Sequence, residues 1–293
     1  MFLPIKIRMS LISIIICSRK QAISTAFSKN IEETIGCEVE WIVIDNSQNT
    51  YSIFEAYNLG IAKSTGKYLC FVHDDIRFHT QNWGIIVDEI FSESDQIGLI
   101  GIAGAKTKTK MPSAWWDCPK QNQVVNVLQH RNEIKIEKWN FGFKSEKWEE
   151  VAVIDGVFMV MKRIENFQFQ TKMQGFHNYD LNISFEMSRL NKKIVVTDCL
   201  LIEHFSMGNI DESWLKSTYQ IHKIYENVLP LNTNSIIIDK QLEISNSRKF
   251  INQCLQHNQL QLACMAWFAL FWFAPFLKFH LKFLYNLVKK IFS

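Results

Sequence analysis

Three polar residues that follow an apolar run are the first candidates for chemistry in this sequence. The run Tyr68–Val72 leads directly into His73, Asp74 and Asp75. Two adjacent carboxylates and an imidazole at the end of a buried strand are costly unless a cation or hydrogen-bond donors lie against them. A divalent cation, Mg²⁺ or Mn²⁺, that bridges the phosphates of a nucleotide would be such a partner. The alternative is an ordinary polar turn after the strand.

Other chemically useful side chains lie at the ends of predicted elements further along the chain. Asp180 is at the start of a helix predicted over residues 181–190, where it is either a helix cap or a reactive carboxylate. His204 follows a short strand predicted at residues 200–202, a place where a histidine is often only a surface residue. A carboxylate within hydrogen-bond reach of a hydroxyl can act as a general base, so Asp180 is the best candidate and His177 a second one.

The elements that would position these residues alternate between strand and helix patterns in the first part of the chain. Apolar runs typical of buried strands occupy residues 11–17, 39–44, 67–72 and 97–102. Amphipathic stretches typical of helices lie between them, at residues 23–35, 53–63 and 83–91. This order predicts an α/β fold with a mostly parallel sheet flanked by helices. Right-handed crossovers would bring the ends of the first three strands to one edge, where Ser18, Asp45 and Asp75 would meet.

The middle of the chain is less regular. A long loop is predicted at residues 106–123, where Trp115 and Trp116 could stack on a sugar or a base, or pack beneath the loop. Further on, Asp155 and Gly156 interrupt an apolar run. They predict either a tight hairpin or a strand that is kinked where another group approaches the backbone closely.

The composition is that of a folded protein, with 47% hydrophobic and 21% charged residues. The net charge of +3 is too small to indicate a nucleic-acid partner. Seven cysteines without framework spacing indicate reduced thiols and a location on the cytosolic side. The apolar run near the N-terminus is short and lacks a cleavage site, so we interpret it as the first strand rather than a signal peptide.

The last part of the chain differs in kind. Residues 229–259 are interpreted as a polar linker, and residues 260–293 as a hydrophobic and amphipathic helical tail. In this tail an apolar stretch precedes a stripe of polar residues, Lys278, Lys282, Asn286 and Lys289. The stretch is slightly shorter than the ~20 residues of a spanning helix. We therefore expect a membrane-associating tail that lies in the interface or forms a re-entrant pair, with its lysines toward anionic headgroups of the cytoplasmic leaflet. A buried helix or an oligomer contact is the alternative.

Taken in order, these motifs resemble the inverting, family-2-like glycosyltransferases of the GT-A fold. The resemblance covers residues 10–210 and includes the segments VIDNS, YNLGIAKSTGKY and FVHDD. It implies that Asp45 recognises the base of a nucleotide-sugar donor and that Asn58 belongs to the donor-binding stretch. His73, Asp74 and Asp75 match the D-x-D motif as an H-x-D variant. Asp75 is then the metal ligand, and Ser18 lies with His73 and Asp74 on the donor side.

The second half of the resemblance concerns the acceptor. Residues 179–182 match the E-D-x-D motif of the family, with Tyr and Asn at the first and last positions. The match implies that Asp180 is the general base and that His204 completes the site for Mg²⁺ or Mn²⁺. It also places Asp155, Gly156 and His177 near the acceptor. On this basis residues 1–105 form the donor-binding half of one GT-A domain and residues 106–228 the acceptor-binding half.

These observations lead to a membrane-associated glycosyltransferase that uses a glycan or lipid-linked acceptor in cell-surface polysaccharide synthesis. A nucleotidyltransferase would need a glycine-rich loop after the first strand, and Ser18-Arg19-Lys20 contains no glycine. The alternative from another class is an inactive relative that serves as a membrane-bound glycan-binding or scaffold subunit. The departures at His73, Tyr179 and Asn182 keep that alternative open.

Overall fold

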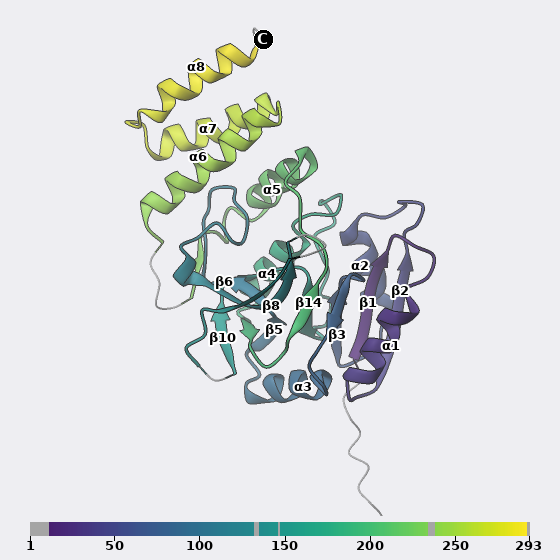
Figure 1. Cartoon of the computed structure of the whole chain (residues 1–293). Helices are drawn as coiled ribbons and strands as arrows, with labels where there is room; N and C mark the ends of the chain where they lie inside the picture. The colour runs from purple at the N-terminus through teal and green to yellow at the C-terminus, as the bar shows by residue number, and fades with distance from the viewer. Residues whose placement is uncertain (1–11, 132–134, 146, 234–237, 292–293) are drawn as a thin grey trace, which may run out of the picture.

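The main layer of the protein is a seven-stranded sheet that is mostly parallel. The computed structural model describes residues 12–131, 135–145, 147–233 and 238–291 (Figure 1). In order across the sheet, the strands are β10 (Trp148–Val151), β13 (Lys193–Thr197), β5 (Ile97–Gly101), β12 (Phe158–Lys162), β3 (Tyr68–Val72), β1 (Ile12–Ser18) and β2 (Val39–Asp45). The strands β2, β1, β3, β5 and β13 run in one direction, and β12 and β10 run against them. This arrangement confirms the predicted α/β fold. The part of the predicted first strand before Ile12 lies outside the described residues.

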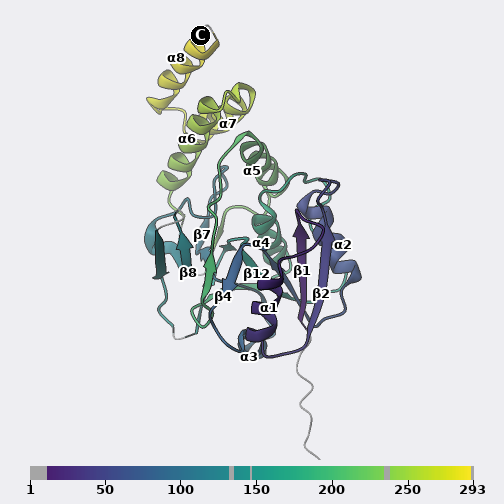
Figure 2. The ribbon, with the colours of Figure 1, turned by 45° about the vertical axis from the view of Figure 1, so that its right-hand side comes forward.

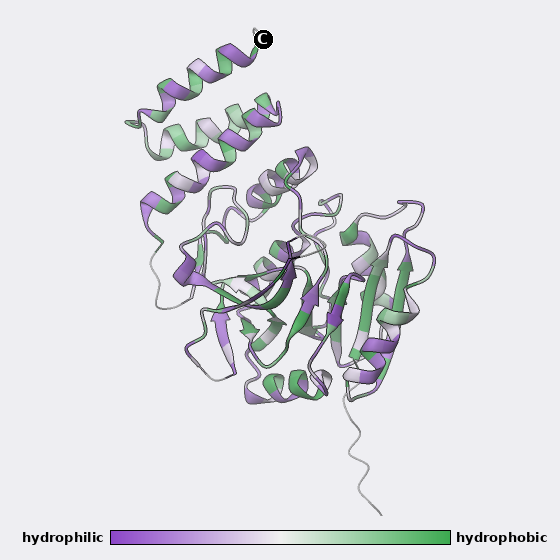
Figure 3. Ribbon diagram, viewed as in Figure 1, coloured by the Kyte–Doolittle hydropathy of each residue, from purple (hydrophilic) through white to green (hydrophobic). Residues whose placement is uncertain are grey.

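Helices cover both faces of this sheet. Ile12, Ile14 and Ile16 of β1 pack into one cluster with α1 (Thr25–Thr34) and α3 (Trp83–Glu93), whereas Ile15 packs on the opposite face with α2 (Ile53–Lys63) and α4 (Tyr179–Arg189). Strands that are buried on both faces are apolar along their whole length, which is why β1 is coloured as hydrophobic in Figure 3. The predicted helix at residues 53–63 has the observed bounds of α2.

A capping box fixes the start of α2. The Ser52 hydroxyl accepts a hydrogen bond from the Glu55 amide, and the Glu55 carboxylate accepts one from the Ser52 amide. Together they satisfy two backbone donors at the helix start.

A second sheet, which the sequence did not predict, lies beside the first. Its strands are β11 (Val153–Ile154), β6 (Ala103–Ala105), β8 (Gln123–His130), β14 (Ile202–His204) and β4 (Ile76–Phe78), and β9 (Ile136–Phe141) pairs with β8. The predicted loop at 106–123 contains the short strand β7 (Thr107–Lys108) and the 3-10 turn Lys120–Asn122. Because β11 and β12 belong to different sheets, the turn at Asp155 and Gly156 is a crossing between sheets and not a hairpin.

The C-terminal part forms a layer of helices next to α5 (Glu212–Ile224), as both views show (Figures 1 and 2). It consists of α6 (Lys240–Gln256), α7 (Leu260–Phe273) and α8 (Phe279–Ile291). Residues 229–259, which we interpreted as a linker, therefore contain a 17-residue helix whose Phe250, Ile251 and Cys254 are buried in a cluster with α7 and α8. In the described part of the chain, none of the helices is both long enough and apolar enough to cross a membrane.

Candidate functional site

The ends of β1, β2 and β3 lie at one edge of the main sheet, as their sequence predicts. Ser18 pairs with Asp45 at the end of β1 and β2, and His73 follows the last residue of the parallel strand β3. Ser18 is buried and its hydroxyl accepts a hydrogen bond from the Lys20 amide. Asp45 is exposed and accepts one from the Ser47 amide at 2.9 Å, which lowers the pKa of its carboxyl group.

His73, Asp75 and His204 form a group of possible metal ligands. One ligand atom from each residue lies within 4.8 Å of the others. Asp75 Oδ1 is 3.5 Å from His73 Nδ1 and 3.8 Å from His204 Nε2. The second sheet brings His204 to this place, because β14 pairs with β4 immediately after Asp75, with His204 opposite Ile76.

The orientation of His204 is fixed by Gln129 of β8. The amide nitrogen of Gln129 donates to the Ser206 carbonyl at 2.7 Å and to the His130 carbonyl at 3.0 Å. Gln129 Oε1 is therefore the acceptor for His204 Nδ1 at 3.1 Å, and Nδ1 carries the proton. The unprotonated Nε2 faces Asp75, as in metal-bound histidines that donate their other N–H to the protein.

His73 has a comparable partner on its far side. Its Nε2 is hydrogen-bonded to the hydroxyl of Tyr179, whose other contact is the Gly156 carbonyl at 3.4 Å. If Tyr179 donates to that carbonyl, it accepts from His73 Nε2–H, and Nδ1 is left unprotonated toward Asp75. Both imidazoles then present a lone pair to the same carboxylate oxygen.

The electrostatics of this group also suit a cation. Burial alone would raise the pKa of Asp75, but without a cation the hydrogen bonds that protons on His73 and Ser206 can make to it hold it well below its ordinary value. A cation at this place would replace the His73 proton as the partner of the carboxylate. Burial lowers the pKa of His204, which keeps it neutral and able to bind a metal. A donor set of two imidazoles and one carboxylate fits a divalent cation.

Asp180 lies in the first turn of α4, immediately after Tyr179. Burial raises the pKa of its carboxyl group to about 7, and the negative charge of Asp155 acts in the same direction. One oxygen, Oδ1, accepts a hydrogen bond from the Leu181 amide at 2.7 Å. A carboxylate with a pKa near neutrality is well matched to accept a proton from a hydroxyl at physiological pH.

Asp155 and Gly156 lie against the same region. Asp155 Oδ2 accepts a hydrogen bond from the Trp115 indole at 2.7 Å, and Oδ1 accepts one from the Val157 amide at 2.9 Å. A Cβ atom on Gly156 would lie 2.6 Å from the Tyr179 ring, so this position requires glycine. The predicted close approach at Gly156 is therefore an approach by Tyr179.

Three residues named in the sequence analysis, Asn58, Asp74 and His177, are not part of the metal-ligand group. The Asn58 amide is held by the Phe169 backbone at 2.7 and 3.0 Å, which ties α2 to the loop before α4. Asp74 is exposed beside Asp75. His177 lies 3.0 Å from the Ser213 hydroxyl and 3.7 Å from Asp211. In the described residues, no hydrogen bond or ion pair joins these three to His73, Asp75 or His204.

Gln129 and the Tyr179 hydroxyl were given no role from the sequence, and His73 was placed with the donor rather than with the metal. Trp115 was considered for stacking or for packing beneath the loop, whereas its indole donates a hydrogen bond to Asp155. The sequence signalled only the Tyr179 hydroxyl, because Tyr179 replaces the glutamate of the E-D-x-D pattern. Gln129 lies on β8, a strand that the sequence did not predict, and Trp115 lies in a turn of the predicted loop.

Comparison with known proteins agrees with this picture. The family model described as "Glycosyltransferase like family" matches residues 13–228, which is most of the chain. This match confirms the family resemblance of the sequence. A curated relative from Fuscovulum blasticum, described as "ATP synthase subunits region ORF 6", is 22% identical over 200 residues. That alignment covers 66% of this chain and 74% of the relative.

Solved structures show more distant similarity. One is GalNAc-T7 with UDP, GalNAc and Mn²⁺, with a TM-score of 0.47 and 11% identity. That match covers 70% of this chain but only 44% of the neighbour's length. Another is TarS residues 1–349 from S. aureus in complex with UDP-GlcNAc, with a TM-score of 0.44 and 9% identity, covering 94% of this chain and 76% of the neighbour.

Proposed function

Because the chain belongs to the glycosyltransferase-like family, we propose that it transfers a sugar from a nucleotide-sugar donor, with inversion, to a glycan or lipid-linked acceptor. One observation carries the proposal. Two consecutive residues at the start of α4 serve the two parts of such a reaction, the departure of the diphosphate and the activation of the acceptor hydroxyl. Tyr179 is hydrogen-bonded to His73 of the metal-ligand group, and Asp180 is a carboxylate of raised pKa.

In the proposed reaction Asp180 accepts the proton of the acceptor hydroxyl. The acceptor oxygen forms a bond to the anomeric carbon while the bond from that carbon to the diphosphate oxygen breaks, so a single displacement inverts the anomeric configuration. Asp155 assists by keeping Asp180 basic, and Trp115 keeps Asp155 in place. A divalent cation bound by His73, Asp75 and His204 would neutralise charge on the departing nucleoside diphosphate.

The donor and the acceptor are proposed to approach from different sides. Ser18 and Asp45 are the last residues of β1 and β2, and Asp74 follows β3 by two residues. This edge of the main sheet is where open α/β sheets bind ligands. Asp155 and Gly156 lie on the Asp180 side, which we propose as the acceptor side. A role for Asn58 toward the donor would be indirect, through the loop that it anchors.

We also propose that the helical tail places the protein on the cytoplasmic face of a membrane, where it would act in cell-surface polysaccharide synthesis. Large apolar side chains on α7, on α8 and between them face solvent, with Phe276 99%, Leu281 75% and Trp272 72% exposed. Several large exposed apolar side chains on one part of a folded protein support an interaction site there. An interfacial helix pair with lysines beside its apolar face fits an anionic membrane surface.

The test is a nucleotide-sugar panel in which release of nucleoside diphosphate is followed with Mn²⁺, with Mg²⁺ and with a chelator. The detergent-solubilised protein and its Asp75→Ala variant are assayed side by side, with donor binding measured separately. We expect metal-dependent release from one donor and loss of that release in the variant. Full activity of the variant would refute the site assignment, and donor binding without turnover across donors and acceptors would favour an inactive relative.

A further inference from the structure

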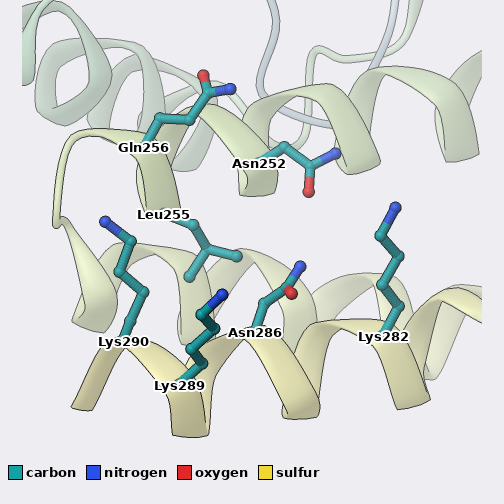
Figure 4. Close-up of a pocket in the computed structure, with 7 residues that line it drawn as sticks. All are labelled: Asn252, Leu255, Gln256, Lys282, Asn286, Lys289 and Lys290. Carbon is teal, nitrogen blue, oxygen red and sulfur yellow. The ribbon is translucent and has the colours of Figure 1, made fainter. Parts of the chain in front are cut away.

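A basic pocket lies between α6 and α8 (Figure 4). These helices lie at the end of the molecule away from the main sheet (Figure 1). Its volume is about 670 Å³, within the usual range for small-ligand sites. The residues that line it are Asn252, Leu255, Gln256, Lys282, Asn286, Lys289 and Lys290. Figure 4 shows the side chains of Lys282 and Asn286 directed from α8 toward α6.

The orientation of α8 explains why its polar residues lie at this pocket. Phe279 and Phe283 are buried against the C-terminal cluster, where Phe283 stacks on Trp267 of α7 with ring centroids 5.0 Å apart. Five large apolar side chains of this helix, Leu281, Leu284, Tyr285, Val288 and Ile291, are exposed beside its exposed lysines. A helix on the surface of a folded protein normally turns its large apolar side chains toward the core. Here Lys282, Lys289 and Lys290 form a lysine border between the exposed apolar side chains and the pocket.

The segment of the sequence that forms the pocket carries charged residues of one sign only. From Ile244 to Ser293 the sequence contains six lysines and arginines and no aspartate or glutamate. Lys290 donates to the Asn258 side chain at 2.9 Å, so its amine is held at one end of the pocket. Gathering like charges is unfavourable unless an anion is present, and a phosphate group is a strong acceptor for ammonium and amide donors.

We infer that this pocket binds the phosphate of an anionic lipid headgroup. With the outward faces of α7 and α8 in the acyl region, the lysine border would lie at the depth of the lipid phosphates. Lys282 and Lys289 supply charge, and Asn286 and Asn252 supply directed hydrogen bonds that select a phosphate over a diffuse negative surface. The inference rests on the membrane association proposed above, and it is independent of sugar transfer.

The experiment measures sedimentation of the full-length protein with vesicles of phosphatidylcholine alone or mixed with phosphatidylglycerol. Lys282→Ala is compared with Lys278→Ala, because Lys278 is an exposed lysine one turn earlier that does not line the pocket. Asn286→Leu removes a pocket amide without changing the charge. Circular dichroism melting curves establish that each variant is folded.

A lysine near an anionic surface contributes about five-fold to binding through long-range attraction alone. We expect that loss for Lys278→Ala, a loss of at least ten-fold for Lys282→Ala, and a clear loss for Asn286→Leu on phosphatidylglycerol vesicles. Equal losses for the two lysine variants with no effect of Asn286→Leu would show that the lysines act only as diffuse charge, and would overturn the inference. Failure of the wild-type protein to bind either vesicle would overturn it as well.

The alternative that the pocket binds a soluble phosphate compound is tested by titrating the protein with inorganic phosphate and following tryptophan fluorescence. Saturable, Lys282-dependent binding that also prevents vesicle binding at low phosphate concentration would assign the pocket to a soluble ligand and refute the lipid assignment. Sugar transfer is assayed in parallel. Absence of transfer with normal vesicle binding refutes the proposed function and leaves this inference intact.

Discussion

The hydroxyl of Tyr179 should control how tightly the protein binds its metal. Tyr179 contacts His73 Nε2 and the Gly156 carbonyl, and its ring is buried against Tyr57 with centroids 5.6 Å apart. Tyr179→Phe removes the hydroxyl and keeps the ring packing. His73 would lose the partner that fixes its tautomer and its ring orientation, although no ligand atom is removed.

The expected loss follows from how such partners act. Removing an outer partner of a ligating histidine typically lowers metal affinity 10- to 100-fold, which is about 1.4 to 2.7 kcal/mol of binding free energy. The hydrogen bond itself is worth about 0.5 to 1.5 kcal/mol, and the rest would come from the freedom that the His73 ring gains. We therefore expect the dissociation constant for Mn²⁺ to rise 10- to 100-fold.

Binding is measured directly, by the electron paramagnetic resonance signal of free Mn²⁺ during titration of the purified protein. The matched control is Tyr57→Phe, which removes a hydroxyl from the buried ring that contacts Tyr179 and leaves the contact to His73 in place. An unchanged dissociation constant in Tyr179→Phe, or an equal change in both variants, would refute this account of how His73 is held.

Two further predictions concern Asp180 and Gly156. Only deprotonated Asp180 can accept a proton, so kcat/KM should fall as the pH decreases through about 7. Asp155→Asn removes a negative charge that raises the pKa of Asp180, so the fall in kcat/KM should move to lower pH. A flat pH profile of kcat/KM from pH 5 to 8 would exclude Asp180 as the base. Gly156→Ala should destabilise the protein by about 1 to 3 kcal/mol in chemical denaturation and weaken Mn²⁺ binding, because the Tyr179 ring must move. Gly208→Ala, where nothing lies within 4 Å of the added carbon, should do neither.

The main sheet could be predicted because its strands are apolar, regularly spaced and separated by amphipathic helices. Three strands of the second sheet, β4, β6 and β11, could not be predicted. Each contains only two or three residues, which is too few to show a periodicity. The helix α6 was missed for a different reason. Its buried side chains include polar ones, among them Glu243, Asn246 and Ser247, so the segment resembles a linker in composition.

The candidate site was predictable to the same extent as the elements that carry it. His73 and Asp75 come after a strand that the sequence identifies, so their position at the edge of the sheet could be predicted. The partner that orients His204 depends on the pairing of β14 with β8, which places Gln129 beside it. β8 begins at Gln123, the last residue of the predicted loop, and the rest of it was not identified as a strand, so this contact was not predicted.

The departures from the family motifs were the main reason to consider an inactive relative, and the structure gives each of them a partner. His73 and Tyr179 are the two departures on either side of the site, and they are hydrogen-bonded to each other. Asn182 is fully buried, donates to the Tyr225 hydroxyl at 2.6 Å and accepts from the Gln170 amide at 2.9 Å. Inactivation would be expected to remove the charged residues first, because a buried carboxylate costs stability unless it has a function. Asp180 is half-buried beside Asp155 and has no ion-pair partner among the described residues, and the presence of a carboxylate there argues for an active enzyme.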